Sequence, residues 1–425
     1  MKIKKLVILS VLLCLVLSGC GNREAEDGVL SSLADRVEEV PGQPEDSARL
    51  QPENTAWNPE DMNEEGSARE SGVAQGVNAS QNSASRTGTG DTQETAATQE
   101  PENTGYDFTI CFAGDINLDE NWGTTQFMSA QENGIYDCIS EELVAVMQEA
   151  DIMCLNNEFT YSTGGEPLAG KAYTFRAMPE RVEVLHQLGV DAVTLANNHV
   201  YDYGAEALLD TFHVLEEAEI SYFGAGRTLE DAMKPLYLEI QGKTVALVGA
   251  SRAEKNKMTP QATDTEPGIL RCYDTELFLE TICEAKANSD FCIAFVHWGT
   301  EYSYELEQVQ PDTGKQYLDA GADAVIGAHS HCLQGMEYYD GKPIIYSLGN
   351  YWFNEKTLDT MLLQLHLTGD DTASQLTVQV IPAVQAGYKT VYASETAQQR
   401  RIYDFLEGIS VNVSISDAGI VSEVK

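Results

Sequence analysis

The stretch Asp323-Ala-Val-Ile-Gly-Ala-His-Ser-His331 places two histidines directly after a short apolar run. Small and branched apolar side chains that follow a Gly-Ala turn predict a buried strand ending at Ala328. In a continuing strand the two imidazoles could not share one face with the apolar core. On the loop at the strand's end, both imidazoles can reach one metal site. Two polar histidines on a surface turn are the alternative interpretation.

Four other strand-like runs end in the same way, which favours the metal site. Each run is short, apolar and rich in β-forming residues, and they cover Phe108–Gly114, Ile152–Asn156, Ala192–Ala196 and Phe291–Val296. The polar residues that follow them are Asp115, Glu158, Asn198 with His199, and His297. Sites in open α/β sheets form beyond the carboxyl ends of the strands. Nitrogen and oxygen ligands without thiolate suit one or two ions of manganese, iron or zinc better than calcium or a copper–thiolate centre.

Helical patterns alternate with these strands and predict an α/β fold. The expected helices are Glu141–Ala150, Pro179–Leu188, Ala205–Glu217, Glu276–Ala287, Pro311–Ala320 and Glu395–Glu407. Antiparallel pairs are expected at Leu236–Gln241 with Thr244–Gly249 and at Met361–Leu367 with Leu376–Ile381. Strands that alternate with helices, with antiparallel additions, are consistent with two sheets packed between helices.

Residues 1–20 have the pattern of a secretion signal, with three early lysines before the apolar run Leu6–Leu17. The run is too short for a comfortable membrane span. Its end, Leu17-Ser-Gly-Cys20, resembles the lipobox of bacterial lipoproteins, which implies cleavage before Cys20 and a diacylglyceryl group on its sulfur. An ordinary signal peptide or a short anchor is the alternative. The lipobox predicts a protein anchored on the extracytoplasmic face of a bacterial cell membrane.

Residues 21–106 are predicted to be a disordered tether. They are rich in Glu, Gln, Ser, Thr, Asn, Gly and Pro and have no sustained apolar period. Such a segment cannot bury enough surface to offset chain entropy, and its excess of acidic residues extends it. Residues 107–425 are long enough to bury one large core and form the predicted folded domain.

The charge of the chain argues against nucleic acid as a partner. Its 67 acidic residues against 26 basic ones give a net charge of −41, and no basic stripe is present to neutralise phosphates. An anionic substrate would therefore need local compensation from bound metal ions or from cations such as Arg176, Arg252, Lys255 and Lys257. Any one of these four side chains is interpreted as a solvated surface charge in preference to a substrate contact.

Seven cysteines remain once Cys14 leaves with the signal and Cys20 carries lipid. The number is odd, there is no Cys-x-x-Cys pair, and Cys111, Cys154 and Cys292 fall inside predicted strands. Free buried thiols are therefore expected rather than a disulfide framework. Cys332, next to His331, is interpreted as a packed neighbour in preference to a soft metal ligand.

The polar groups after the strands have complementary chemical roles. Asp115 and Glu158 bring negative charge, Asn198 offers a neutral oxygen, and the imidazoles of His297, His329 and His331 offer neutral nitrogens. A pair of dications held in this way can clamp a phosphoryl oxygen and activate water. His199, next to Asn198, is the candidate acid that protonates a leaving oxygen. Asp202 could orient His199, although a cap on the following helix is the favoured interpretation.

Together these residues resemble the motif series of the CapA family, the bacterial capsule-synthesis proteins associated with poly-γ-glutamate. The motifs are Gly114-Asp115, Asn156-Asn-Glu158, Ala196-Asn-Asn-His199 with Asp202 and Gly204, His297-Trp-Gly-Thr-Glu-Tyr302, Gly327-Ala-His-Ser-His331 and Tyr346-Ser-Leu-Gly-Asn350. The resemblance implies the fold of calcineurin-like metallophosphoesterases, a four-layer α/β/β/α sandwich. It also implies that Glu158 is a carboxylate bridging two metals and that Asn198 and His199 form the family's Asn-His pair.

Three positions depart from the pattern that this resemblance implies. Asn117 stands where the phosphoesterases carry a histidine, and it is kept as a metal-ligand candidate. Glu158 replaces the usual bridging aspartate, and Ser330 stands where many CapA proteins have proline. These departures bear on the number of metals and on the rigidity of the turn between His329 and His331.

Four further residues are weaker candidates for substrate contact or for support of the ligands. Trp298 and Tyr302 would floor a substrate cleft, with structural aromatic residues as the alternative. Glu301 would act on substrate or lie exposed, and Asn350, after a tight Leu-Gly turn, would support the metal loops.

Two functional classes follow from these interpretations. The first is a metal-dependent hydrolase or transferase that acts on a phosphoester, on an anionic envelope polymer or on a polyglutamate-type amide. The second is a non-catalytic factor of capsule assembly or polymer retention on the same fold, with other capsule-synthesis membrane proteins as partners. The acidic surface counts mildly against a polyanionic substrate, and an acid beside the metals, His199, is needed only by an enzyme.

Overall fold

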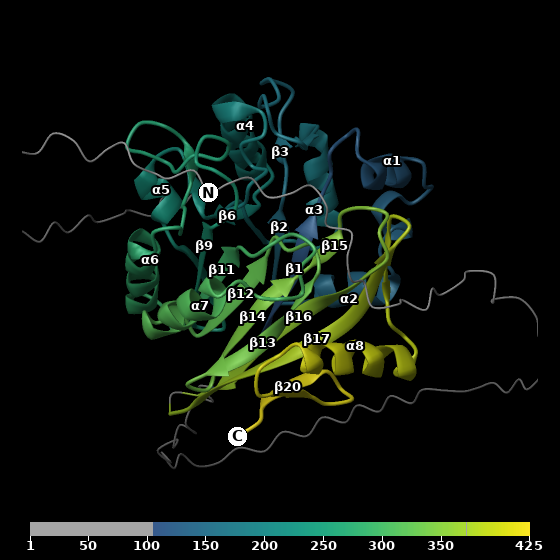
Figure 1. Ribbon diagram of the computed structural model, residues 1–425, viewed down its shortest axis with the longest axis vertical. Helices are drawn as coiled ribbons and strands as arrows, with labels where there is room; N and C mark the ends of the chain where they lie inside the picture. The colour runs from purple at the N-terminus through teal and green to yellow at the C-terminus, as the bar shows by residue number, and fades with distance from the viewer. Residues whose placement is uncertain (1–104, 371) are drawn as a thin grey trace, which may run out of the picture. The chain divides into compact units, whose positions relative to one another are not determined.

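The protein is described by a computed structural model over residues 105–370 and 372–425 (Figure 1). The predicted signal sequence, the predicted lipidation at Cys20 and nearly all of the predicted tether lie outside the described residues. Strand β1 (Tyr106–Ile116) begins at the last residue assigned to the tether. Among the described residues, no helix combines the length and apolar character that crossing a membrane requires.

Two β-sheets form the centre of the molecule. The main path of the ten-stranded sheet is β19 (Val413–Ile415), β20 (Ile420–Glu423), β17 (Ser374–Ala386), β16 (Leu358–Gly369), β1, β2 (Ile152–Asn157), β5 (Ala192–Thr194) and β6 (Ser221–Phe223), with β15 (Asn350–Trp352) beside β1 and β18 (Lys389–Tyr392) beside β17. The order of the six-stranded sheet is β13 (Leu333–Tyr339), β14 (Lys342–Leu348), β12 (Ala324–Ala328), β11 (Phe291–His297), β9 (Lys243–Ser251) and β8 (Leu236–Ile240). Two small ladders pair β3 (Thr160–Tyr161) with β4 (Arg176–Ala177) and β7 (Ala225–Gly226) with β10 (Gly268–Ile269).

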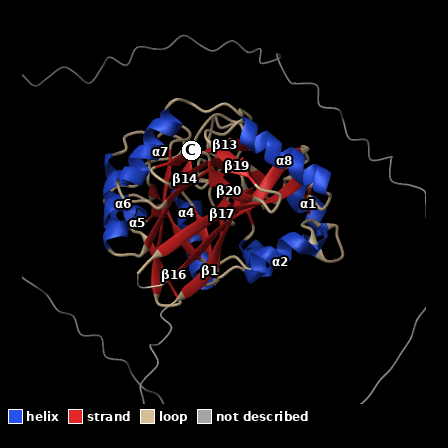
Figure 2. Ribbon diagram, turned by 90° about the horizontal axis from the view of Figure 1, so that it is seen from below, coloured by secondary structure: helices blue, strands red, loops and turns tan. Residues whose placement is uncertain are grey.

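Helices cover the outer faces of both sheets. The α-helices are α1 (Gly123–Ser129), α2 (Glu141–Glu149), α3 (Glu183–Gln187), α4 (Gly204–Glu217), α5 (Leu229–Met233), α6 (Glu276–Ala287), α7 (Val309–Asp319) and α8 (Thr396–Gly408), and two 3₁₀ turns are η2 (Gly134–Asp137) and η3 (Pro179–Val182). Figure 2 shows α5, α6 and α7 on one side of the strands and α1, α2 and α8 on the other.

Alternation along the strands separates three apolar cores. On β1, Phe108 and Phe112 face the core between the two sheets, where the Phe112 ring lies 6.2 Å from that of Phe295 on β11. Cys111 and Ala113, the neighbours of Phe112 on either side along β1, face the outer core that α2 and α4 cover. A third core lies between the six-stranded sheet and helices α6 and α7. Because side chains alternate with a period of two, one strand serves two cores, and the predicted four-layer α/β/β/α sandwich is confirmed.

The strands that carry the predicted site residues run parallel within each sheet. In the first sheet β1, β2, β5 and β6 are parallel, and in the second β9, β11, β12 and β14 are parallel. Parallel strands place their carboxyl ends at one edge of the sheet. The polar residues at or just after the carboxyl ends of β1, β2, β5, β11 and β12 therefore meet at one edge of the sandwich.

The predicted elements are present with differences at their ends, except that the helix expected at Pro179–Leu188 is the 3₁₀ turn η3 followed by the short helix α3. Helix α7 begins at Val309, two residues before the expected start at Pro311, because proline is tolerated in the first turn of a helix. Strand β5 ends at Thr194 and leaves Ala196 in the loop. Strand β13, which directly follows the two histidines and pairs with β14, was not predicted.

The seven cysteines of the described residues are free, as predicted. Six of them are buried, and only Cys283 among these seven is exposed. Burial raises the pKa of the Cys332 thiol to about 11, and its Sγ lies 4.0 Å from the Ser330 hydroxyl. Cys332 belongs to neither of the acidic and imidazole groups described below, so the structure favours a packed neighbour over a soft ligand.

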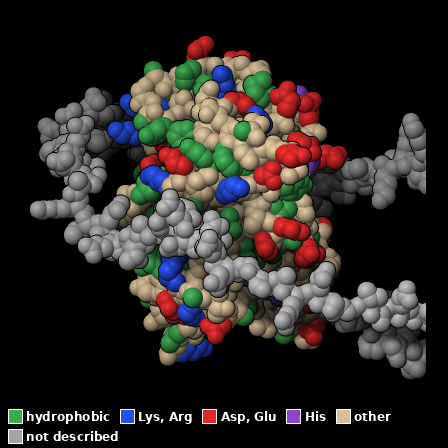
Figure 3. Space-filling model, turned by 90° about the vertical axis from the view of Figure 1, so that its right-hand side faces the viewer, with side chains coloured by type: hydrophobic (Ala, Val, Ile, Leu, Met, Phe, Trp, Pro, Cys, Tyr) green, Lys and Arg blue, Asp and Glu red, His purple; other side chains and the backbone are tan. Residues whose placement is uncertain are grey.

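The surface is predominantly acidic, in keeping with the composition. In the face shown in Figure 3, Asp and Glu side chains gather on the right-hand side and Lys and Arg side chains are scattered. No continuous basic stripe crosses that face of the described residues.

Gly114 fixes the approach of β1 to the turn after β14. A Cβ atom at Gly114 would lie 1.9 Å from the carbonyl oxygen of Gly349, which itself accepts a hydrogen bond from the Asp115 backbone N–H at 3.0 Å. We expect Gly114→Ala to destabilise the protein by about 1–3 kcal/mol through overpacking. The matched control is Gly408→Ala at the end of α8, where nothing lies within 4 Å of the added Cβ atom. Equal urea midpoints for the two variants would contradict the close approach.

Candidate metal site

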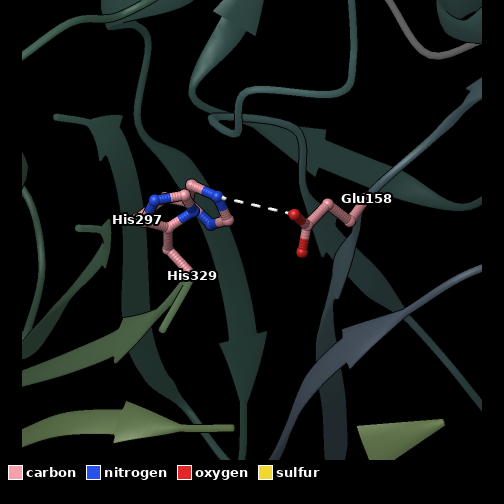
Figure 4. Close-up of side chains that lie close together, drawn as sticks. All are labelled: Glu158, His297 and His329. Atoms are coloured by element: carbon pink, nitrogen blue, oxygen red, sulfur yellow. Dashed lines mark ion pairs between the residues drawn. The ribbon is translucent and has the colours of Figure 1, made fainter. Parts of the chain in front are cut away.

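Five strand ends bring the predicted ligands together in a buried cluster. Two groups of three side chains have ligand atoms within 4.8 Å of one another, and they are Glu158, His297 and His329, and Asp115, Glu158 and His331. Figure 4 shows the imidazoles of His297 and His329 side by side, with the Glu158 carboxylate pointing toward them from across the site. Because Glu158 belongs to both groups, its position is that of a carboxylate shared between two cation sites.

Glu158 is the feature that most requires a cation. Its side chain is fully buried, and its Oε1 atom has no hydrogen-bond partner among the described residues. Three imidazole Nε2 atoms surround this oxygen, those of His297 at 3.8 Å and of His199 and His331 at 3.9 Å. Burial, and then the charge of Asp115, hold the pKa of Glu158 well above its usual value. An unpartnered buried carboxylate oxygen is costly, and a cation would offset that cost, so the residues fit a divalent metal.

His331 is fixed by two acceptors on its other ring nitrogen. Its Nδ1 lies 3.1 Å from Asp115 Oδ2 and 2.8 Å from Asn350 Oδ1. Burial acts to lower the pKa of His331, but the hydrogen bond and the charge of Asp115 outweigh burial and raise it. Burial acts to raise the pKa of Asp115, but the hydrogen bond and the charge of His331 outweigh burial and lower it. The Asn350 side chain therefore holds the His331 ring, and the Nε2 atom of His331 faces Glu158.

His297 and His329 are neutral imidazoles. Burial, followed by the charges of neighbouring histidines, lowers the pKa of His297 well below its usual value and that of His329 to about 3. His297 Nε2 lies 2.7 Å from Asn198 Oδ1, and His329 Nδ1 has no partner among the described residues. Neutral imidazole nitrogens and an amide oxygen are ligand atoms for manganese, iron or zinc.

The loop after β12 holds both histidines in backbone conformations that only a minority of residues adopt. His329 has φ 95° and His331 has φ 55°. The residue between them, Ser330, is fully buried, and its hydroxyl donates to the Cys332 carbonyl oxygen at 2.7 Å. Strained backbone at non-glycine residues persists where the surroundings determine it, and it clusters at functional sites. The serine in place of proline thus supplies a hydrogen bond that restrains the turn.

Two asparagines organise the site and were not among the predicted site residues. Asn156 Nδ2 donates to Asp115 Oδ1 at 2.7 Å and to Glu158 Oε2 at 3.1 Å, which links the two carboxylates. Asn197 Oδ1 accepts the backbone N–H groups of His199 and Val200, both at 3.0 Å. The sequence feature that could have indicated them is the Asn-Asn pair repeated at two strand ends. A buried amide needs hydrogen-bond partners, which apolar strand residues do not provide.

His199 and Asp202 form a buried pair. His199 Nδ1 lies 2.7 Å from Asp202 Oδ2, and a carboxylate oxygen accepts, so Nδ1 carries the hydrogen. Burial lowers the pKa of His199, while the charge of Asp202 acts in the opposite direction. The favoured interpretation of Asp202 as a helix cap is wrong, because α4 begins at Gly204 and its N-cap residue Tyr203 makes no side-chain cap hydrogen bond. Asp202 orients His199 instead.

A match to a family of known proteins accompanies this arrangement. A family model described as bacterial capsule synthesis protein PGA_cap matches residues 109–355, more than half of the chain. This chain belongs to the PGA_cap family. The resemblance to CapA proteins drawn from the sequence motifs is thereby confirmed.

Individual relatives of this PGA_cap chain include two capsule proteins. It is 32% identical over 242 residues to the PGA biosynthesis protein CapA of Bacillus subtilis (strain 168), covering 56% of this chain and 63% of the relative. It is 35% identical over 212 residues to the capsule biosynthesis protein CapA of Bacillus anthracis, covering 48% of this chain and 51% of the relative. The match thus spans between half and two thirds of the length of these relatives.

A solved structure is also similar. The 5'-nucleotidase from Candida albicans aligns over 62% of this chain and 48% of its own, with 14% identity and a TM-score of 0.33. This TM-score is too low to support an argument about the fold, which rests on the layers of the PGA_cap chain itself.

Three weaker candidates of this PGA_cap protein have side-chain contacts that do not involve the ligand groups. Trp298 is fully buried, and its indole N–H donates to the Tyr346 carbonyl oxygen at 2.9 Å, so the structural alternative holds and the prediction that it floors a cleft is wrong. The Arg252 guanidinium lies 4.5 Å from the centre of the Tyr273 ring. Asn117 is buried, and its Oδ1 accepts the Asp119 backbone N–H at 2.8 Å, so this oxygen is used within its own turn.

Two other candidates lie closer to the ligands. The Tyr302 ring is 39% exposed and its centre lies 5.6 Å from that of the His331 ring. Glu301 is exposed, and its charge contributes to raising the pKa of both Glu158 and His331. Both residues therefore remain candidates for contact with a substrate.

Sequence reasoning missed Lys171. It lies in the loop between β3 and β4, and its side chain is 4% exposed. Its Nζ donates to Asp202 Oδ1 at 2.5 Å and to the backbone carbonyl of Asn198. Lysine is almost never buried without a partner, and both partners are distant in the sequence, so no local pattern could have indicated it.

Proposed function

We propose that this PGA_cap chain is a divalent-metal-dependent hydrolase or transferase that acts in the synthesis of a capsule or another cell-envelope polymer. The observation that carries the proposal is the unpartnered Oε1 atom of Glu158 among three imidazole Nε2 atoms. A non-catalytic scaffold would have no reason to maintain a buried carboxylate without a partner beside a histidine that Asp202 orients.

The ligands fit two cations, with manganese, iron and zinc as the proposed identities. Asp115, Glu158 and His331 would hold one ion, and Glu158, Asn198, His297 and His329 would hold the other. When bound, such a pair of dications supplies charge stabilisation at a phosphoryl or carbonyl oxygen and activates water. Asn156 and Asn350 keep Asp115, Glu158 and His331 in place through the hydrogen bonds described above.

His199 is the proposed proton donor to the leaving group. Asp202 holds its Nδ1–H, and its Nε2 atom faces the Glu158 carboxylate at 3.9 Å. A ring held in this way presents one nitrogen to the space between the ligands and cannot rotate without losing the bond to Asp202. The Phe175 ring, whose centre lies 4.5 Å from that of the imidazole, limits the approach of water from that side.

The proposed substrate is a phosphoester or a polyglutamate-type amide of the envelope, because the relatives are named for capsule and PGA biosynthesis. We further propose that the chain acts on the extracytoplasmic face of the membrane, anchored through a diacylglyceryl group on Cys20, with capsule-synthesis membrane proteins as partners. The lipobox-like sequence Leu17-Ser-Gly-Cys20 supports the anchor. We expect a Cys20→Ser variant to leave the membrane fraction, and its retention there would contradict the anchor.

The test is turnover by the full chain after loading with manganese, iron or zinc. Aryl phosphomonoesters, phosphodiesters and γ-glutamyl amides are the probes, each assayed with and without a chelator. We expect hydrolysis of one class that the chelator abolishes. Stoichiometric metal without turnover of any class would contradict catalysis and would favour a capsule assembly or polymer-retention factor on the same fold.

A further inference from the structure

The loop between β3 and β4 is fastened to the turn that carries His199. The backbone N–H of Leu168 donates to the Asp202 carbonyl oxygen at 2.9 Å, and the backbone N–H of Phe175 donates to Asp202 Oδ2 at 2.7 Å. Between these two points, the Lys171 ammonium donates to Asp202 Oδ1. Asp202 thus accepts hydrogen bonds from this loop at its backbone carbonyl oxygen and at both carboxylate oxygens.

Lys171 also contacts the other end of the turn that carries His199. Its Nζ donates to the backbone carbonyl oxygen of Asn198, which additionally accepts from the Thr259 hydroxyl at 2.9 Å. Asn198 and Asp202 flank His199 in the chain, so one ammonium group ties together the two ends of the turn on which the imidazole sits. The Asn197 amide holds the backbone of the same turn from within.

We propose that Lys171 is a positioning residue for His199. By occupying Asp202 Oδ1, the ammonium leaves Oδ2 as the acceptor for His199 Nδ1–H and sets the plane of the carboxylate. His199 then presents Nε2 toward Glu158 at 3.9 Å. The functional consequence rests on the proposed function, whereas the effect on the His199–Asp202 hydrogen bond does not.

Charge supports the same role. Asp202 and His199 are buried, and the Lys171 ammonium is the ion-pair partner of the Asp202 carboxylate at 2.5 Å. A buried ion pair contributes little net stability, yet removal of one partner leaves an uncompensated charge. Without Lys171, the Asp202 Oδ1 atom would lose its ammonium partner, and we expect the carboxylate to rotate. That rotation would release the Nδ1 hydrogen of His199.

The experiment compares Lys171→Met and Lys171→Arg with the wild type in the full chain labelled with ¹⁵N at its 7 histidines. The readout is the low-field imidazole signal of His199 Nδ1–H, assigned by its loss in His199→Ala. We expect this signal to be present in the wild type, absent or strongly shifted in Lys171→Met, and restored in Lys171→Arg, which keeps the charge. If Lys171→Met does not fold, Lys171→Gln takes its place with the same expectation.

The matched control is Lys315→Met, which removes an ammonium paired with Glu337 at 2.8 Å on the far side of the second sheet. We expect Lys315→Met to keep the His199 signal and the wild-type turnover. With a substrate in hand, Lys171→Met should lower kcat by at least about tenfold while KM and bound metal stay within about twofold of the wild type.

Two results would overturn the proposal. One is a folded Lys171→Met or Lys171→Gln protein that retains the wild-type His199 signal. The other is a variant in which metal content falls together with the signal, because Lys171 would then hold the whole site together and not His199 alone. If instead the wild type binds no metal and turns over no substrate, the proposed function fails while the imidazole signal still tests Lys171.

Discussion

Replacing Glu158 with glutamine should abolish binding of both metal ions and make the metal-free protein more stable. Glu158 is the side chain that both ligand groups share, so loss of its charge affects the two positions together. In the metal-free protein its Oε1 atom is buried without a partner and burial raises its pKa, so replacing the ionisable group removes the cost of burying or protonating it. The expected gain is about 1–3 kcal/mol in the free energy of unfolding.

Two measurements on Glu158→Gln check these opposite effects. Elemental analysis gives the metal content, and urea unfolding with and without a chelator gives the stability of each state. The matched control is Glu217→Gln, which changes a 70% exposed side chain on α4 and should leave both quantities unchanged. Wild-type metal content in Glu158→Gln would contradict the shared role of this carboxylate. A metal-free variant less stable than the metal-free wild type would contradict the cost assigned to the buried oxygen.

Replacing His199 with alanine should leave the metal in place and remove most of the turnover. The two ligand groups do not include His199, and its Nδ1 atom is engaged by Asp202. Loss of a positioned proton donor lowers rates by about 10²–10⁴-fold. We therefore expect kcat of the hydrolytic reaction to fall within that range while metal content stays as in the wild type.

The control for His199→Ala is His213→Ala on the exposed face of α4, where the side chain is 67% exposed and pairs with Glu217. Unchanged turnover in His199→Ala would show that no acid is needed from this position. Loss of metal from His199→Ala would assign the imidazole to the ligand set. Either finding would contradict the role proposed for His199.

The ligand cluster could be predicted from the sequence because each ligand is identified by the short apolar run that precedes it. Short apolar runs identify strands, and in parallel sheets the residue after each run lies at the same edge. This reasoning placed Asp115, Glu158, His297, His329 and His331 correctly in one cluster. The alternation of apolar strands with amphipathic helices predicted an α/β fold consistent with two sheets packed between helices, and the resemblance to the CapA family implied the four-layer sandwich.

The supporting contacts could not be predicted because their partners are distant in the sequence. Asp202 stands two residues before α4, where a cap and an orienting carboxylate have the same local pattern, and only the positions of His199 and Lys171 distinguish them. Trp298 follows a strand end directly, yet its indole turns into the core to reach Tyr346. A strand end fixes where a residue lies and leaves open which way its side chain points.

The measurement that most directly tests the metal site is the metal content of the purified full chain. We predict two equivalents of manganese, iron or zinc, with lower thermal stability after chelation and recovery when the metal is restored. No bound metal, together with no thermal stabilisation on addition of manganese, iron or zinc, would contradict the claim that Glu158 is shared between two cations.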